Sequence, residues 1–339
     1  MMSDEALRVG VIGAGSWGTT LAKISAERGH ETRLWARREE LAAQLREARE
    51  NVDYLPGVSL PDSLQVTHDL AEVVRQSELL VLVVPSHALR LVARCVGDTA
   101  RGEQCLIHAT KGLERGTHKR MSEILREETC LRKIGVLAGP NLAAELARGE
   151  PTGTLIASRY EEVRRRGHAA FSNGYFRVYW GSDVVGAEVG GAFKNIIALA
   201  AGVLSGLGLG ENARALLLTR GLGEMAELGT AMGADLTTFG GMAGVGDLVA
   251  TSSSPLSRNF QVGTRLARGE RLEPIQAEMK MVAEGVNTSL AVMEFARARR
   301  LTLPIVSAVH RLLHEGGDVP TLLQELMAIP TGQEFRRSS

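Results

Sequence analysis

Hydrophobic and polar positions divide the chain into two halves with different periodicities. In the first half, continuous apolar runs alternate with segments of helical periodicity, which is typical of buried parallel strands joined by helices. The predicted strands cover residues 7–12, 31–36, 78–85, 104–110, 133–140 and 152–158, with a late strand at 176–182. This half therefore predicts an α/β domain built on a doubly wound parallel sheet.

After about Asp183 the strand signals stop and only helical patterns follow. Helices are predicted at residues 186–204, 212–232, 256–268, 288–299 and 305–314, separated by the glycine clusters SGLGLG, FGGMAGVGD and EGGD. We expect an N-terminal dinucleotide-binding domain at residues 1–185 and a helical substrate domain at 186–339. A cleft between two such domains is a natural place for a substrate to meet a cofactor.

Composition excludes several classes of protein. The 339 residues are 44% hydrophobic and 23% charged, and the formal net charge is zero, so no broad electrostatic footprint for nucleic acid is expected. Three cysteines (Cys95, Cys105 and Cys130) without a CxxC pair argue against a disulfide framework and a zinc site. The acidic start MMSDEA resembles no signal peptide, and Lys194 interrupts the best apolar run, so we expect a cytoplasmic protein without a membrane span.

The segment VGVIGAGSWGTTLA places a GxGxxG pattern between the first strand and a helix that ends near Gly29. In this context the pattern predicts a Rossmann-type dinucleotide site. Gly13 permits the tight turn, Gly15 lets the backbone approach a pyrophosphate, and Gly18 lets helix and strand pack closely. The helix N-terminus then faces the negative charge of the cofactor.

The end of the second strand indicates which cofactor is used. An NAD-specific site usually has an acidic residue here for the ribose hydroxyls, whereas this chain has Arg37 and Arg38. Two guanidiniums can bind a 2′-phosphate, so the sequence favours NADPH over NADH. The alternative is that both arginines only begin a solvated helix with Glu39 and Glu40.

Two lysines are candidates for chemistry. Lys111, in TKG, follows a predicted strand at the edge where open α/β sheets bind ligands, although it could also be a surface lysine of a loop. Lys194 lies inside the apolar segment GAEVGGAFKNIIALAAG. Burial would lower its pKa and suit it to accept a proton from an alcohol, while the alternative is a lysine that extends along apolar surface to solvent. His108, inside a strand, is interpreted as structural.

The segment SSSPLSRNFQVGTRL predicts a helix start with Ser257 as the N-cap and Arg258 and Asn259 in the first turn. Free backbone N–H groups, the helix dipole and a guanidinium together form an anion site. The alternative is an ordinary capped helix with a surface arginine.

Several motifs, taken together, resemble one family. They are GVIGAGSWGTTLA, LWAR, VPSHALR, ATKGLE, LAGPNLAAE, GGAFKNIIALAAG, GMAGVGDLVAT, SPLSRNFQVG and VAEGVNT. Their order resembles that of bacterial NAD(P)-dependent glycerol-3-phosphate dehydrogenase, from about Arg8 to beyond Pro320. The resemblance implies reversible reduction of dihydroxyacetone phosphate, a phosphorylated triose, to sn-glycerol 3-phosphate, the precursor of glycerophospholipids. It also implies a homodimer.

The resemblance further implies the roles of individual residues. Lys194 is similar to the family's proton acceptor. The implied substrate-binding residues are Lys111, Gly139, Asn141, Lys194, Asp247, Ser257, Arg258 and Asn259. The implied cofactor-binding residues are Gly13, Gly15, Ser16, Trp17, Gly18, Arg37, Arg38, Lys111, Ala143, Arg258, Val282 and Glu284.

One position departs from the family, and two other functions stay open. Asn141 stands where the family usually has Ser or Thr after GP, so its substrate contact differs in length and chemistry. A related dehydrogenase with a helical second domain could act on a 3-hydroxy acid or on ketopantoate. A non-catalytic dinucleotide sensor is the other alternative, although Lys194 and Asp247 argue against it.

Overall fold

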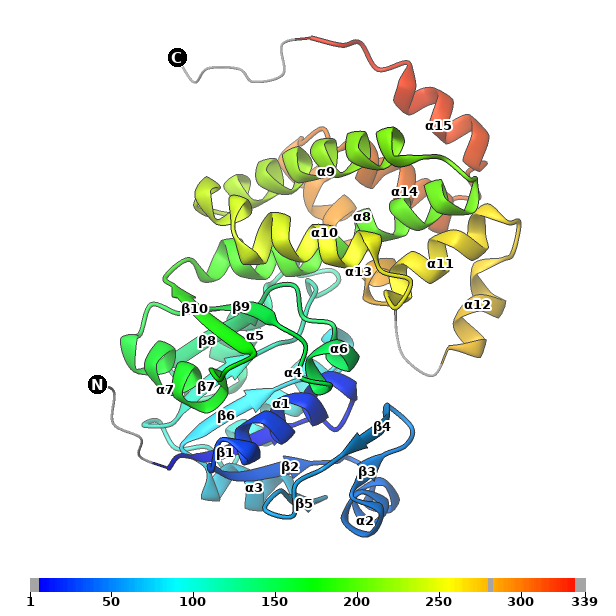
Figure 1. The fold of residues 1–339 in the computed structure, drawn as a ribbon. Helices are drawn as coiled ribbons and strands as arrows, with labels where there is room; N and C mark the ends of the chain where they lie inside the picture. Colours follow the sequence, from blue (N-terminus) through cyan, green and yellow to red (C-terminus); the bar gives the residue numbers. More distant parts are fainter. Residues whose placement is uncertain (1–5, 280–282, 333–339) are drawn as a thin grey trace.

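The computed structural model describes residues 6–279 and 283–332 (Figure 1). Its first half is built on an eight-stranded sheet in the order β10-β9-β8-β7-β6-β1-β2-β5. The strands are β1 (Arg8–Ile12), β2 (Glu31–Trp35), β5 (Gln65–Thr67), β6 (Leu79–Leu82), β7 (Cys105–His108), β8 (Lys133–Ala138), β9 (Thr152–Ala157) and β10 (Phe176–Gly181). The α/β prediction is confirmed, because β1, β2, β5, β6, β7 and β8 run parallel.

Helices cover both faces of this sheet. They are α1 (Ser16–Glu27), α2 (Glu39–Ala48), α3 (Leu70–Gln76), α4 (Ser86–Gly97), α5 (Met121–Glu128), α6 (Ala143–Ala147) and α7 (Glu161–Phe171). Alternate strand residues supply the two cores: Val11 and Val81 pack towards α1 and α7, while Ile12 and Leu82 pack towards α3, α4 and α5. The strands are buried on both sides, which explains their continuous apolar sequences.

Part of the sheet differs from the sequence prediction. Strand β9 runs antiparallel to β8, and β10 continues parallel to β9, so the sheet is not wholly parallel. The connection from β8 contains only the five-residue helix α6, which is too short to carry the chain back across the sheet. A two-stranded hairpin, β3 (Glu50–Asn51) and β4 (Leu55–Ser59), was also not predicted.

The second half is helical, as predicted, and is arranged around α8 (Val184–Gly206). The other elements are α9 (Glu211–Ala231), the short helices η1 (Leu236–Gly240) and η2 (Met242–Gly246), α10 (Asp247–Ser253), α11 (Arg258–Ala267), α12 (Leu272–Glu278), α13 (Glu284–Arg299), α14 (Pro304–His314) and α15 (Val319–Met327). The boundary predicted after residue 185 falls in the first turn of α8 and stays a prediction.

Helix α8 corrects one expectation from the sequence. It is 23 residues long and, by length and composition alone, apolar enough to cross a membrane, despite Lys194. However, 78% of its apolar window is buried inside the protein, where Phe193, Ile196 and Ile197 form the core of the helical half. Its hydrophobicity is therefore accounted for by its central position (Figure 1).

Glycines let other segments approach α8 closely. A Cβ atom at Gly190 would lie 2.1 Å from the carbonyl oxygen of Ala243 in η2. A Cβ at Gly202 would lie 2.0 Å from the oxygen of Phe260, and one at Gly263 would lie 2.0 Å from that of Leu199. Such distances exclude any side chain, so α8, η2 and α11 pack backbone against backbone.

Candidate functional site

Two lysines share one buried carboxylate where the two halves meet. Lys111 Nζ donates to Asp247 Oδ2 at 2.9 Å, and Lys194 Nζ donates to Asp247 Oδ1. Lys194 also donates to Thr251 Oγ1 at 2.7 Å. Asp247 is fully buried and Lys194 is 6% exposed, whereas the side chain of Lys111 is 20% exposed. The structure thus brings together three residues that the sequence singled out.

Local structure explains how Asp247 reaches the lysines. It is the first residue of α10 and follows the π-helical turn η2, which packs against Gly190 of α8. Thr251 lies four residues later on the same face of α10 and was not predicted from the sequence. In the segment GDLVAT, Thr251 follows Asp247 by four residues, a spacing that puts both on one face of a helix. This spacing points to Thr251 only when Asp247 is known to belong to the site.

The surroundings favour the neutral form of Lys194 more than water does. Burial lowers the pKa of Lys194, the carboxylate of Asp247 opposes this by raising it, and the charge of Lys111 lowers it further. Since burial is the largest cause, we expect a pKa below the ordinary lysine range. A lysine of this kind can exchange a proton near neutral pH.

Helix α11 presents its N-terminus beside this centre. Ser257 is the N-cap and its Oγ accepts from Phe260 N at 3.4 Å, as predicted. Asn259 donates to Asn195 Oδ1 at 2.9 Å and accepts from Gly285 N at 2.9 Å. The side chain of Asn195, the residue after Lys194, thus connects α8 to α11.

Arg258 is the charged residue of this helix N-terminus. Burial lowers the pKa of its guanidinium, and the nearby carboxylate of Glu284 opposes this. Glu284 begins α13 and accepts from Ser86 of α4, with Ser86 Oγ at 2.6 Å and Ser86 N at 3.2 Å. Glu284 thus connects the helical half to the end of strand β6. Val282 lies outside the described residues.

The glycine turn after β1 has the shape that a dinucleotide requires. Gly13 has φ 123°, and a Cβ there would lie 2.3 Å from the oxygen of Val83. A Cβ at Gly18 would lie 1.8 Å from the oxygen of Gly13, which confirms the close packing predicted. A Cβ at Gly15 would meet nothing within 4 Å, and no side chain caps α1. The turn therefore leaves room for a pyrophosphate at the N-terminus of α1.

Arg37 and Arg38 follow β2 at the same edge of the sheet as the glycine turn, and both are exposed. Arg38 lies 3.9 Å from Asp53 of the β3–β4 hairpin, so one acidic side chain stands next to the arginine pair. Ser16 and Trp17 form the first turn of α1, and the Trp17 ring packs edge-on against Phe176.

Asn51, at the start of the unpredicted hairpin, contacts the glycine turn directly. Its Nδ2 donates to Ala14 O at 3.0 Å and to Thr19 Oγ1 at 2.8 Å, and the residue is fully buried. Asn51 therefore fixes the turn from the side. No periodic pattern marked this residue in the sequence.

Replacing Asn51 by leucine should weaken binding of NADPH roughly fivefold to a hundredfold, because the turn loses two buried hydrogen bonds of about 0.5–1.5 kcal/mol each. Titration with NADPH measures the dissociation constant. Gln104→Leu is a matched control, since Gln104 is also buried and its Nε2 donates to Val74 O and Ser77 O beside the start of β7, at the opposite edge of the sheet. Equal effects of the two substitutions would contradict the role given to Asn51.

Asn141 uses its amide within the loop after β8. Its Nδ2 donates to Gly139 O at 3.0 Å and to Thr154 Oγ1 at 3.0 Å, while its Oδ1 is buried and has no hydrogen-bond partner within residues 6–279 and 283–332. Gly139 has φ 151° and Ala143 O accepts from Thr20 Oγ1 of α1. The loop thus lies against α1. The Oδ1 atom of Asn141 stands where the family usually has a Ser or Thr hydroxyl.

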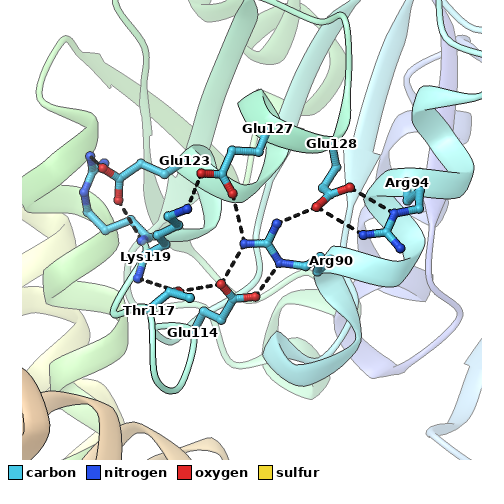
Figure 2. A network of polar contacts seen from close by, with 9 residues as sticks. Arg90, Arg94, Glu114, Thr117, Lys119, Glu123, Glu127 and Glu128 are labelled. Carbon is cyan, nitrogen blue, oxygen red and sulfur yellow. Dashed lines mark hydrogen bonds and ion pairs between the residues drawn. The ribbon is translucent and has the colours of Figure 1, made fainter.

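The loop that carries Lys111 is also held at the surface. Figure 2 shows Arg90 of α4 between Glu114 of the loop and Glu127 and Glu128 of α5. Hydrogen bonding to Arg90 is the first cause that lowers the pKa of Glu114. Lys119 of the same loop pairs with Glu127.

Comparison with known proteins identifies both halves. Residues 8–164 match the family model described as NAD-dependent glycerol-3-phosphate dehydrogenase N-terminus, and residues 183–324 match the corresponding C-terminus model. A glycerol-3-phosphate dehydrogenase [NAD(P)+] from Corynebacterium glutamicum is 49% identical, covering 94% of this chain and 97% of the relative. One from Streptomyces griseus is 44% identical, covering 97% and 99%.

Solved structures agree with these sequence matches. Glycerol-3-phosphate dehydrogenase from Coxiella burnetii is 33% identical, with a TM-score of 0.91, and the match covers 95% of this chain and 99% of that one. A ketopantoate reductase from Ralstonia eutropha is 18% identical, with a TM-score of 0.57, and the match covers 94% and 99%. The second likeness shows the fold alone.

Proposed function

Since the chain belongs to the NAD-dependent glycerol-3-phosphate dehydrogenase family, we propose that it catalyses the reversible NAD(P)H-dependent reduction of dihydroxyacetone phosphate to sn-glycerol 3-phosphate. This reaction supplies the precursor of glycerophospholipids. The observation that carries the proposal is the buried carboxylate of Asp247 between Lys111 and Lys194. It lies beside a helix N-terminus with an arginine, which suits a phosphorylated ketone.

Lys194 is the proposed acid and base of this reaction. When bound, the reduced nicotinamide supplies the hydride. Lys194 in its ammonium form gives a proton to the developing alkoxide of the substrate, and neutral Lys194 takes it back during oxidation. Asp247 and Thr251 orient Nζ by accepting two of its hydrogen bonds. Lys111, held by the other oxygen of Asp247, offers a second cation to the substrate oxygen.

The remaining roles are proposed by position. Arg258 and the first N–H groups of α11 bind the phosphate, with Ser257 and Asn259 shaping this helix end. Gly139 and Asn141 form the loop wall, where the unpartnered Oδ1 of Asn141 can accept from a substrate hydroxyl.

The proposed cofactor residues follow the same edge of the sheet. Gly13, Gly15, Ser16, Trp17 and Gly18 form the turn and first helical residues beside which a pyrophosphate would lie. Arg37 and Arg38 are proposed for the adenosine end, and Lys111, Ala143, Arg258 and Glu284 for the nicotinamide end; Val282, the remaining predicted cofactor residue, lies outside the described residues. A cytoplasmic location and a homodimer stay predictions, and light scattering of the purified protein tests the dimer.

Absorbance assays with alternative substrates test the proposed reaction. We expect oxidation of NAD(P)H with dihydroxyacetone phosphate, and none with ketopantoate or a 3-keto acid. Turnover of ketopantoate instead would favour a related dehydrogenase. Tight binding of NADPH without turnover of any of these substrates would favour a non-catalytic dinucleotide sensor.

Exchanging Arg37 and Arg38 for aspartate and serine should lower kcat/KM with NADPH at least about tenfold more than with NADH, because charge-assisted hydrogen bonds to the 2′-phosphate are lost. Steady-state kinetics with both cofactors measures this ratio, and NADH serves as the internal control. An equal loss with both cofactors would show that these arginines do not bind the 2′-phosphate.

A further inference from the structure

A second buried carboxylate lies on α8, outside the centre described above. The side chain of Glu188 is 2% exposed. It accepts from Ser122 N and Ser122 Oγ, both at 2.7 Å, and from Arg120 Nη1 at 2.7 Å. The Nε2 atom of His108 lies 3.1 Å from its Oε1, as an ion-pair approach without aligned hydrogen-bond geometry. One carboxylate therefore joins α8 to β7 and to the start of α5.

This carboxylate is ionised and strongly held. Burial alone would raise its pKa, but His108, the charge of Arg120 and the N–H of Ser122 prevail and lower the pKa of Glu188 to about 2. Breaking one of these contacts would leave a buried charge or polar group without its partner, which is costly. The positions of Glu188 and its partners relative to one another are therefore tightly determined.

Both ends of this connection lead to the proposed catalytic lysines. His108 is the last residue of β7, three residues before Lys111. Glu188 lies six residues before Lys194 on α8, and Gly191 between them faces the Lys111 side chain, with a built Cβ 3.8 Å from Lys111 Cγ. The strand that leads to one lysine is thus fastened to the helix that carries the other.

We propose that Glu188 is a positioning residue, which sets the place of Lys111 relative to Lys194 by fastening the end of β7 to α8. The inference rests on the roles proposed for the two lysines. The surface network of Figure 2 also holds this loop, through Glu114 and Lys119. However, its partners are partly exposed, and ion pairs of this kind stabilise a structure weakly.

The test is a double-mutant cycle between Glu188 and Lys111. In Glu188→Gln, an NH₂ group replaces one carboxylate oxygen. This group can only donate, yet it faces the donors of Ser122 and Arg120, so β7 should shift against α8. We expect kcat/KM for dihydroxyacetone phosphate to fall about fivefold to twentyfold, since small misplacements of reacting groups are costly. In a Lys111→Ala background the same substitution should have almost no further effect, because contacting or coupled residues are non-additive.

Glu224→Gln is the matched control. Glu224 is also buried in the helical half and accepts from Ile305 N and Val306 N at the start of α14. It should lower the melting temperature without changing kcat/KM in either background. If Glu188→Gln lowers kcat/KM equally in both backgrounds, or only lowers the melting temperature, Glu188 is merely structural. If Lys111→Ala alone leaves kcat/KM unchanged, the role proposed for Lys111 fails instead.

Discussion

Replacing Lys194 by alanine should lower kcat for dihydroxyacetone phosphate roughly 10²–10⁴-fold, the usual contribution of a positioned acid or base. Lys194 is buried, and its Nζ is oriented by Asp247 and Thr251, so no neighbouring lysine can take its place without a rearrangement. The dissociation constant of NADPH should stay nearly unchanged, because the glycine turn lies in the other half. Stopped-flow or steady-state kinetics measures kcat, and titration measures cofactor binding.

Lys133→Ala is the matched control for this experiment. Lys133 pairs with Glu162 at the start of β8, at the edge of the sheet remote from the carboxyl ends of the strands, and its loss should leave kcat unchanged. Near-normal turnover of Lys194→Ala would exclude Lys194 as the acid and base.

The pH profile provides a second readout of the same residue. In the oxidation of glycerol 3-phosphate, kcat should rise with pH as Lys194 loses its proton, with a midpoint below the ordinary lysine range, because burial lowers its pKa. Asp247 raises this pKa, so Asp247→Asn should move the midpoint to lower pH. Asp235→Asn is a matched control, because it removes one negative charge at an exposed site and should leave the midpoint unchanged. An unchanged midpoint in Asp247→Asn would contradict the pairing of Asp247 with Lys194.

Replacing Arg258 by alanine should raise KM for dihydroxyacetone phosphate about tenfold or more, because a lost hydrogen bond to a charged group costs about 1.5–3 kcal/mol and 1.4 kcal/mol is one decade. Glycerol and glycerol 3-phosphate differ by a dianion, so much of the binding energy must come from that group. We expect kcat to fall as well, since remote binding energy helps to orient the reacting carbon. Affinity for NADPH should also decrease, because Arg258 lies near Glu284, which we propose for the nicotinamide end.

Two further variants make the result for Arg258 specific. Arg258→Lys keeps the charge but cannot donate in parallel to two phosphate oxygens, so it should recover only part of the loss. Arg265→Ala removes an arginine from the last turn of the same helix, where it pairs with Glu270, and should leave KM unchanged. Inorganic sulfate should inhibit the wild type competitively and Arg258→Ala much less. Wild-type KM and sulfate sensitivity in Arg258→Ala would place the phosphate elsewhere, with Lys111 as the next candidate.

The sequence predicted elements and individual site residues where local patterns carry the information. The glycine turn, the cap at Ser257 and the buried position of Lys194 all follow from short segments. Short segments could not predict that Lys194 and Lys111 both bind Asp247, because these lysines lie 53 and 136 residues away from it in the chain. Packing of α8 against η2 at Gly190 and against the Lys111 side chain at Gly191 brings these residues together.

Other errors have the same origin in tertiary structure. The direction of β9 depends on the short connection through the five-residue helix α6, which cannot carry the chain back across the sheet. The apolar sequence of a strand does not indicate its direction. Asn195 follows Lys194 directly in the sequence, but adjacent helical residues point in different directions. Its amide accordingly contacts Asn259. Asn51 was missed because its partners belong to a turn 32 and 37 residues earlier.

The backbone contacts between α8 and α11 have a mechanical consequence. Because Gly202 and Gly263 leave no side chains between the two helices, these helices move as one body, and with them Lys194 and Arg258. The Lys111–Asp247 and Ser86–Glu284 contacts instead connect this body to the sheet. If the halves separate to admit or release ligands, the spacing between Lys194, the proposed proton donor, and Arg258, the proposed phosphate anchor, is preserved. Any such separation would have to break these bridging contacts and also those of Glu188 with Ser122 and Arg120, which join α8 to the start of α5.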